Sequence, residues 1–419
     1  MTFLADLRFA VGSAAVQQLI PIILLTATHK KSILRYLAIP CMFWIARQNV
    51  RPMDGYSQIL VFITGQVFTS IPQAINLLLI NPLEVDDLVR ENPGRTKTLT
   101  GRFLYAHEIL SQFRGVGTPR QVKGIPAHPA YYHDPQTGRV TSIGRFDFML
   151  RQFYTLAWQY AIYDIIEFFG HRQEPVPAGV FTDPKWNVSG GEWVERILTH
   201  FVTWFLVVRI CIDSRVRLFS ILHVGLGLSS PLDWPPMFGR MADAYTLRNF
   251  WGVFWHQNLR QSLTAVSSWI TRDVMHLPRP SVLERYSNIF LVFLQSGLIH
   301  VATDATMGIP ARWSGAVPFF TTFTLGIMIE DGVQSLYRTM SGSEENGVPK
   351  WKRGVGFLWV VLWLGVTSTW FIHPGTQSSP PHSMSIVPYC ISERIGFEPV
   401  AGFAAIGGLA LIFGFEGEI

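Results

Sequence analysis

Long apolar segments constrain the fold of this chain more than any other feature of its sequence. A helix needs about 20 apolar residues to cross a bilayer. Runs expected to span the membrane occupy residues 9–28, 56–80, 148–169, 193–212, 286–303, 316–337, 354–372 and 399–415. A weaker span, shortened by Pro40, lies at 36–46. These segments predict an all-α, polytopic transmembrane bundle of about 8–10 helices.

Composition supports a membrane location. Hydrophobic residues make up 48% of the chain and charged residues only 15%, whereas soluble domains carry about 25% charged residues. The net charge of +5 fits basic cytoplasmic loops and is no indication of nucleic-acid binding. The cysteines, Cys41, Cys211 and Cys390, are widely spaced, so no disulfide framework is expected.

The distribution of charge suggests three regions. Residues 1–80 are expected to form the N-terminal transmembrane helices. Residues 81–146 are rich in Gly and Pro and carry nine Lys and Arg against six Asp and Glu. Because basic loops prefer the cytoplasmic side, residues 81–147 are predicted to be a cytosolic loop with a short interfacial helix near 103–113. Residues 148–419 hold the remaining helices, and the short run 218–228, which carries His223, is expected to be a re-entrant or broken helix.

Several charged side chains fall inside or next to predicted spans, where a charge is costly and often functional. The acidic ones are Asp164, Glu167, Glu330 and Asp331. They leave open a transporter of a hydrophobic metabolite, although no internal repeat of the kind found in many transporters is visible. For Glu330 and Asp331 the alternative is a helix-end position near the headgroups. Arg209 and Asp213, four residues apart, are expected to form a structural ion pair.

A histidine, His300, ends the apolar run that starts at Phe290. Burying a polar ring in hydrocarbon costs free energy unless a partner or cavity receives it. If the segment is helical, Ser296 and Asp304 share the face of His300. A neutral histidine can accept a proton from a substrate hydroxyl, and Asp304 could orient its ring. The alternative is a helix-end histidine that bonds to a carbonyl or faces the headgroups.

The segment Tyr245–Arg260 concentrates aromatic, amide and basic side chains before that helix. If it is one helix, its polar face is a stripe of Asn249, Gly252, His256 and Arg260. A neighbouring aromatic stripe holds Phe250, Trp251, Phe254 and Trp255. Arg248 and Arg260 could pair with the phosphates of an anionic cofactor, and tryptophan faces could stack on a base. A plain interfacial anchor would explain the same composition.

Three stretches form a set whose order and spacing matter together. They are Pro235-Pro-Met-Phe-Gly239, Leu247-Arg-Asn-Phe-Trp-Gly-Val-Phe-Trp-His-Gln257 and Phe293-Leu-Gln-Ser-Gly-Leu-Ile-His300. This set resembles the wax synthase-like branch of the membrane-bound O-acyltransferases. Within that branch it is most similar to fungal enzymes that acetylate terpenoid or meroterpenoid alcohols. Detailed similarity covers residues 225–335, and the remainder matches only in hydropathy and length.

The resemblance implies a helical bundle in the endoplasmic reticulum with a buried tunnel. It implies acetyl-CoA or another acyl-CoA as co-substrate, entering from the cytosolic side, and a hydrophobic alcohol as acceptor. No bound metal or cofactor is expected. The family's catalytic histidine corresponds to His300, whereas His256 stands where relatives often have Asn or Asp. The residues expected to contact CoA or the tunnel mouth are Arg248, Trp251, Trp255, Gln257 and Arg260, with His256 beside them.

The sequence therefore predicts an acyl-CoA-dependent O-acyltransferase, with residues 148–419 as its core. His300 is expected to act as general base, with His256 and Asp304 as further catalytic candidates, and the acyl group is expected to be acetyl. A long-chain acyl-CoA:alcohol acyltransferase that makes wax or sterol esters is an alternative with the same chemistry. The transporter is an alternative of a different class.

Overall fold

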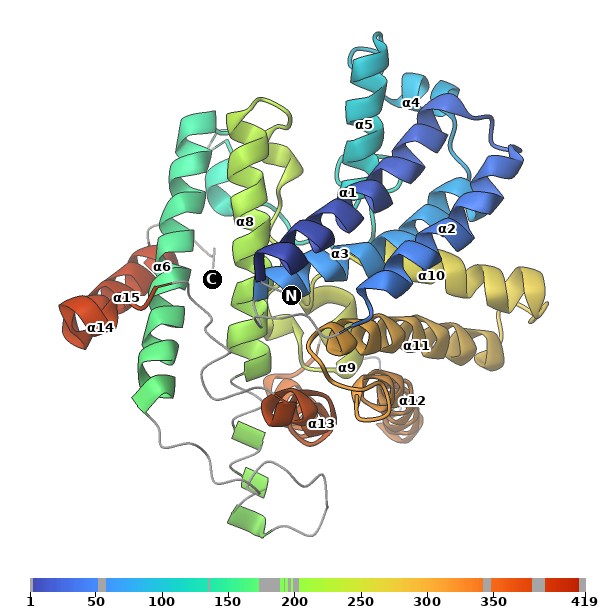
Figure 1. Cartoon of the computed structure of the whole chain (residues 1–419). Coiled ribbons are helices and arrows are strands. Elements are labelled where there is room, and N and C mark those ends of the chain that lie inside the picture. Colours follow the sequence, from blue (N-terminus) through green and yellow to red (C-terminus); the bar gives the residue numbers. More distant parts are fainter. Residues whose placement is uncertain are drawn as a thin grey trace. The chain divides into compact units, whose positions relative to one another are not determined.

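The computed structural model describes residues 3–51, 58–134, 136–172, 189–191, 193–194, 197–198, 203–341, 348–378 and 389–413. Across these residues the regular structure is helical, apart from one isolated bridge between His133 and Val140. The predicted all-α class is therefore confirmed. In Figure 1 the helices are coloured along the sequence, from blue at the N-terminus to red at the C-terminus.

Five helices in the described part of the chain are long and apolar enough to cross a membrane. They run over Leu4–Ala27, Leu60–Ile80, Val282–Thr306, Ala316–Met340 and Lys350–Ile372. Each coincides with a span predicted from the sequence. The predicted spans at 36–46, 148–169 and 399–415 correspond to α2 (Ile33–Asn49), α6 (Arg145–Arg172) and α15 (Phe397–Phe413), which are not among the five candidate spans. The predicted span at 193–212 includes residues outside the described part of the chain.

The chain divides into two compact units that are not continuous in sequence. The first contains Met1–Val122, Gln257–Arg353 and Trp370–Ser379. The second contains Lys123–His256, Gly354–Thr369 and Pro380–Ile419. Each unit is therefore assembled from segments that lie far apart along the chain.

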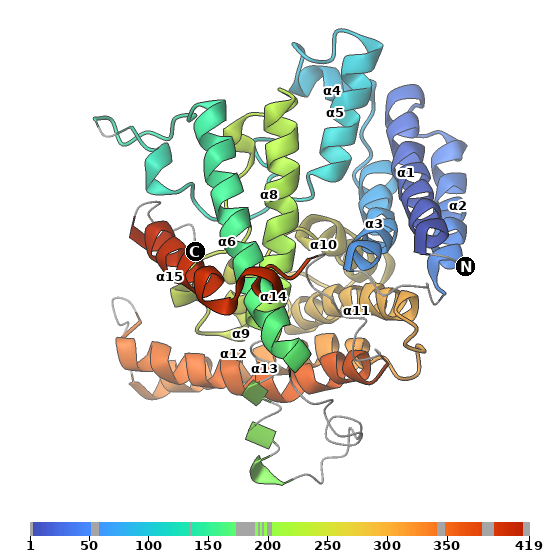
Figure 2. The same cartoon turned by 60° about the vertical axis from the view of Figure 1, so that its left-hand side comes forward.

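In the first unit, α1 (Phe3–Ala27), α2 and α3 (Gln58–Ile75) lie side by side (Figures 1 and 2). The region after α3, predicted as a loop with one short helix, contains α4 (Val85–Glu91) and α5 (Leu99–Ser111). Helix α5 packs on α1 and contributes to the same hydrophobic core. Members of this core include Leu25, Met42, Val67, Leu77 and Leu110.

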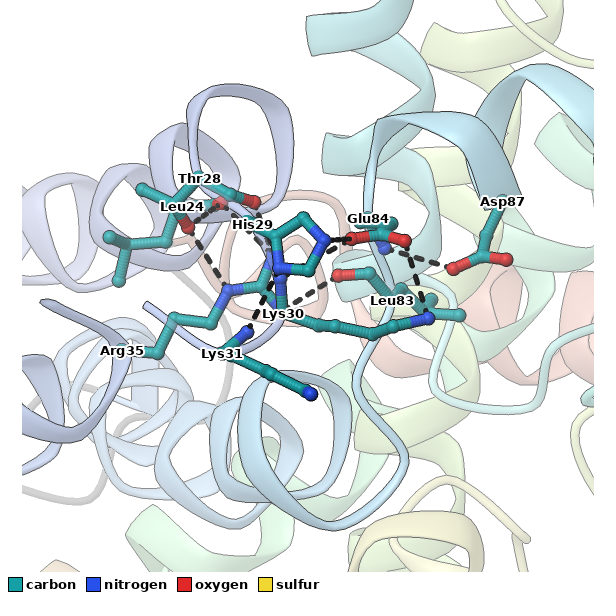
Figure 3. Close-up of polar contacts among 9 residues, drawn as sticks. All are labelled: Leu24, Thr28, His29, Lys30, Lys31, Arg35, Leu83, Glu84 and Asp87. Carbon is teal, nitrogen blue, oxygen red and sulfur yellow. Dashed lines mark hydrogen bonds and ion pairs between the residues drawn. The ribbon is translucent and has the colours of Figure 1, made fainter. Parts of the chain in front are cut away.

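A buried arginine joins three chain segments at one end of this unit (Figure 3). The Arg35 side chain is 0% exposed. Its guanidinium donates to the carbonyl oxygens of Leu83 at 2.8 Å and Thr28 at 2.8 Å, and to the Thr28 hydroxyl at 3.0 Å. The last carbonyls of a helix lack partners within the helix, so Arg35 stabilises the C-terminal end of α1. Glu84 adds ion pairs to Lys30 at 3.2 Å and His29 at 3.3 Å.

In the second unit, α6 packs along α8 (Arg209–Gly225), and α15 packs on α6 (Figures 1 and 2). Helix α8 runs without a break from Arg209 to Gly225, so a broken helix within 218–225 is wrong, while a re-entrant segment at 218–228 stays a prediction. Asp213 accepts hydrogen bonds from Arg217 at 2.6 Å and Gln159 at 2.7 Å. This pairing within the helix and with α6 lets the charged turn near residue 213 remain helical. The predicted pair of Arg209 and Asp213 interacts electrostatically, while the direct ion pair of Asp213 is with Arg217.

Candidate active site

His300 lies in α11 (Val282–Thr306) between two aromatic rings of the same unit. Phe320 of α12 (Ala316–Ser341) stacks on the imidazole, with ring centroids 4.7 Å apart and planes 9° apart. Phe371 of α13 (Lys350–Ser378) meets it edge-on at 5.1 Å. Within the described part of the chain no hydrogen bond engages the imidazole. The ring is therefore fixed by packing, and its nitrogens can serve a substrate.

Two glycines allow this arrangement by close approach. A Cβ on Gly297 would lie 2.9 Å from Cα of Val317, at the start of α12. A Cβ on Gly315 would lie 1.8 Å from the carbonyl oxygen of Trp370, which precedes Phe371. Because any larger side chain would force these segments apart, the glycines bring both aromatic rings against His300.

Asp304 lies one turn after His300 and is 3% exposed. Its carboxylate accepts a hydrogen bond from the Ser314 hydroxyl at 2.5 Å. Its carbonyl oxygen accepts from the Ile309 amide at 3.0 Å. These contacts close the connection between α11 and α12. Asp304 was predicted to orient the His300 ring, and in the structure its carboxylate bonds to Ser314.

The segment 245–260 does not form a single helix, so the predicted polar stripe is not aligned on one face. Helix α9 (Leu247–Asn249) continues into one π-helical turn, Phe250–Phe254, and the backbone becomes extended at Trp255 (φ −70°, ψ 151°). Helix α10 (Arg260–Trp269) then starts afresh. Asn249 and Gly252 therefore belong to a different helix from Arg260.

Aromatic packing explains why the helix ends there. Trp255 is 4% exposed and stacks on Phe250, with centroids 5.5 Å apart. Phe238, from the Pro-Pro turn, meets Trp255 at 5.2 Å, and the Arg209 guanidinium lies 5.3 Å from the Phe238 ring centroid. Trp255 thus belongs to the core of the second unit, whereas Trp251 is half-buried at its edge, 5.8 Å from Trp255.

The polar residues of this segment divide between the two units. Arg248 and His256 belong to the second unit, and Gln257 and Arg260 to the first. The His256 ring lies 5.6 Å from that of Trp255. Arg260 donates to Gln257 at 2.9 Å. Burial lowers the pKa of Arg260, but an arginine remains protonated at neutral pH, so its charge is retained.

Asp164 and Asp331, two of the four acidic residues near the predicted spans, have structural partners. Asp164 is fully buried and accepts hydrogen bonds from the Ile391 amide, the Ser392 hydroxyl and, at 2.9 Å, the Ser392 amide. It therefore fixes the start of α14 (Ser392–Ile395). Asp331 accepts from Arg285 at 2.9 Å and Tyr286 at 2.7 Å. These contacts give structural roles to two of the charged residues on which the transporter alternative depended.

Phe320 and Phe371 were not among the predicted site residues. Phe320 could have been suggested by pairing two antiparallel spans joined by a short turn, because such helices meet along one face. Phe371 lies in a third span, and nothing in the periodicity of α13 specifies which of its faces would meet α11.

Comparisons with known proteins agree with the resemblance in the sequence. Residues 234–322 match the model of the "Membrane bound O-acyl transferase family". The chain is 39% identical to the acetyltransferase spyB of Aspergillus fumigatus, over 99% of this chain and 72% of that protein. It is 37% identical to the acetyltransferase pyr8 of the same species, over 94% of this chain and 92% of that protein. No solved structure matches.

A further relative is the acetyltransferase atnC of an Arthrinium species, 37% identical over 96% of this chain and 95% of that protein. The chain belongs to the membrane-bound O-acyltransferase family. It is an O-acyltransferase, and the relatives described here all bear the name acetyltransferase.

Proposed function

We propose that the protein transfers an acetyl group from acetyl-CoA to a hydroxyl of a hydrophobic secondary metabolite, a terpenoid or meroterpenoid alcohol. The names of the relatives support acetyl as the group transferred. The observation that carries the catalytic assignment is His300, an imidazole held by rings on two other helices and not engaged by any hydrogen bond in the described residues.

In this mechanism His300 is the general base. A ring nitrogen takes the proton of the acceptor hydroxyl as the hydroxyl oxygen attacks the thioester carbonyl carbon. The new C–O bond forms, the C–S bond breaks, and the CoA thiolate leaves and takes the proton back from the imidazolium. General-base catalysis of this kind contributes about 10²–10⁴-fold. Holding both substrates in line supplies much of the remainder.

The proposed contacts of acyl-CoA are those predicted from the sequence of segment 245–260. Arg248 and Arg260 carry positive charge for the CoA phosphates, because guanidinium groups pair with phosphate oxygens in a bidentate manner. Of the two tryptophans in segment 245–260, Trp251 is half-buried and offers more ring surface than the enclosed Trp255. His256 and Gln257 complete the proposed contacts. The proposed location is the endoplasmic reticulum, with acyl-CoA entering a tunnel from the cytosolic side.

The test is a CoA-release assay on microsomes that contain the wild type or His300→Ala. Acetyl-CoA and palmitoyl-CoA are supplied separately with a panel of terpenoid alcohols. His276→Asn is the matched control, since His276 is exposed on the surface and Asn tolerates its positive φ of 52°. We expect release from acetyl-CoA that requires an alcohol, is lost in His300→Ala and persists in His276→Asn.

Each other outcome contradicts a specific part of the proposal. Release that persists in His300→Ala would exclude this residue as the base. Release from palmitoyl-CoA but not acetyl-CoA would make the protein a wax- or sterol-ester synthase. Uptake of an alcohol into the microsomes with no CoA release from either donor would favour the transporter.

A further inference from the structure

The interface between α11 and α12 (the α11–α12 seam) contains a buried hydroxyl that makes no hydrogen bond among the residues that the structure describes. Thr324 of α12 is 8% exposed, and its Oγ1 contacts no donor or acceptor within the described part of the chain. A helical threonine usually donates to the carbonyl three or four residues earlier. Thr321, one turn earlier, does so, donating to the Val317 carbonyl at 2.8 Å.

The position of Thr324 follows from two ring contacts across the seam. Phe320, four residues before Thr324, stacks on His300, and Phe323, its neighbour, lies 5.6 Å from Phe293. Residues four apart share a helical face, so Thr324 lies on the face that meets α11, one turn from the partner of His300. Burying an unpaired hydroxyl costs free energy, and a substrate oxygen at this position would remove that cost.

We infer that the Thr324 hydroxyl donates a hydrogen bond to the carbonyl oxygen of the acyl donor and stabilises the negative charge that develops on it. This inference rests on the proposed role of His300. In the transfer step, His300 takes the acceptor proton, the C–O bond forms, the carbonyl oxygen becomes an oxyanion, and the C–S bond then breaks. Thr324 keeps its own proton throughout.

The spacing is suitable for one acyl group held between the two side chains. One helical turn separates the levels of Phe320 and Thr324 by about 6 Å. Two hydrogen bonds of about 2.8 Å each, one to the acceptor hydroxyl and one to the carbonyl oxygen, together with reacting atoms about 3 Å apart, reach about 8.6 Å when fully extended, so a bent arrangement covers one turn. The phenylalanine rings at this seam offer no hydrogen-bond donor, whereas a threonine hydroxyl does.

Ser296 is the alternative donor, because it lies on α11, one turn before His300, whereas Thr324 lies on α12. Its side chain is half-buried, whereas the Thr324 hydroxyl is enclosed. An enclosed donor is worth more to a developing oxyanion, because water does not compete for the charge. The comparison of the two hydroxyls is therefore part of the test.

The experiment compares Thr324→Val, Thr324→Ser, Ser296→Ala and the control Thr321→Val in purified protein. The acceptor is the alcohol that the wild type acetylates fastest, or water if acetyl-CoA hydrolysis is the faster reaction. For Thr324→Val we expect kcat to fall about 10²–10³-fold, the usual effect of removing one oxyanion donor. The KM for acetyl-CoA should change little, since this bond strengthens only in the transition state. Thr324→Ser should retain most activity, and Thr321→Val and Ser296→Ala should behave nearly as the wild type.

A stability measurement separates this role from a structural one without requiring turnover. Because Thr324→Val removes an unpaired buried hydroxyl, its Tm without substrate should equal or exceed that of the wild type. A lowered Tm, a kcat equal to that of Thr321→Val, or a loss in Thr324→Ser as large as in Thr324→Val would overturn the inference. A loss in Ser296→Ala alone would assign the donor to α11. These outcomes leave the base assignment intact, since that assignment fails only if His300→Ala remains active.

Discussion

The Asp304 carboxylate is the buried charge nearest to His300 along α11, and its contacts define what it can do. The carboxylate accepts a hydrogen bond from the Ser314 hydroxyl, and the backbone carbonyl oxygen of Asp304 accepts one from the Ile309 amide. Both bonds tie the end of α11 to the chain that leads into α12. Asp304 therefore contributes to the site by fixing the turn on which the register of the two helices depends.

Substitutions at this pair should affect stability more than turnover. Ser314→Ala leaves the buried carboxylate short of one hydrogen bond and should destabilise the protein by about 1–3 kcal/mol. Asp304→Asn keeps an acceptor oxygen and should cost less. Thermal unfolding in detergent and kcat measured on the folded protein check this. If Asp304→Asn instead lowered kcat at least a hundredfold with an unchanged Tm, Asp304 would act on the His300 ring directly.

At the scale of helices, the seam between α11 and α12 determines the environment of His300. The helices approach at Gly297, where a Cβ would come within 2.9 Å of Val317. The same approach places Phe320 over the imidazole and Phe323 beside Phe293. The Ser-Gly-Leu-Ile-His stretch thus combines a contact point for a neighbouring helix with the proposed base, His300, one turn later.

A larger residue at Gly297 should separate the two helices. We expect Gly297→Val to destabilise the protein by about 1–3 kcal/mol, as overpacking does, and to lower activity because Phe320 moves away from His300. Gly332→Ala is the matched control, since a Cβ at Gly332 meets nothing within 4 Å and Ala favours the helix by about 1 kcal/mol. Tm and CoA release measure both effects. Full activity in Gly297→Val would show that the stacking is dispensable.

The success of sequence analysis also varied by element. The spans at 286–303, 316–337 and 354–372 were predicted within a few residues of α11, α12 and α13, because long apolar runs leave few alternatives in lipid. The helix across 245–260 was wrong, since the stacking of Trp255 on Phe250 ends it after one π-helical turn. His300 could be singled out by its costly position. Thr324 could not, because a hydroxyl without a partner is visible only once the helices are packed.

For the whole molecule, the first unit indicates how the N-terminal helices cross the membrane. The α1 span Leu4–Ala27 ends beside residues 83–84, which follow the span Leu60–Ile80, and the bonds of Arg35 and Glu84 join these ends. The basic group at that end, His29, Lys30 and Lys31, favours the cytoplasmic side. The division into two units could not be predicted, because each gathers distant segments.

This arrangement predicts which positions are accessible in sealed microsomes. In a protein with Cys41, Cys211 and Cys390 replaced by Ser, Lys31→Cys and Lys97→Cys should react with a membrane-impermeant maleimide before detergent is added. Both lysines are exposed. Lys97 follows Glu84 in the chain, and Glu84 pairs with Lys30 at the C-terminal end of the first span.

Leu4→Cys, at the other end of the first span, should react only after detergent. A 24-residue helix is about 36 Å long and crosses the hydrocarbon core, so its two ends lie on opposite sides. Labelling of Leu4→Cys before detergent, with Lys31→Cys protected, would invert the orientation.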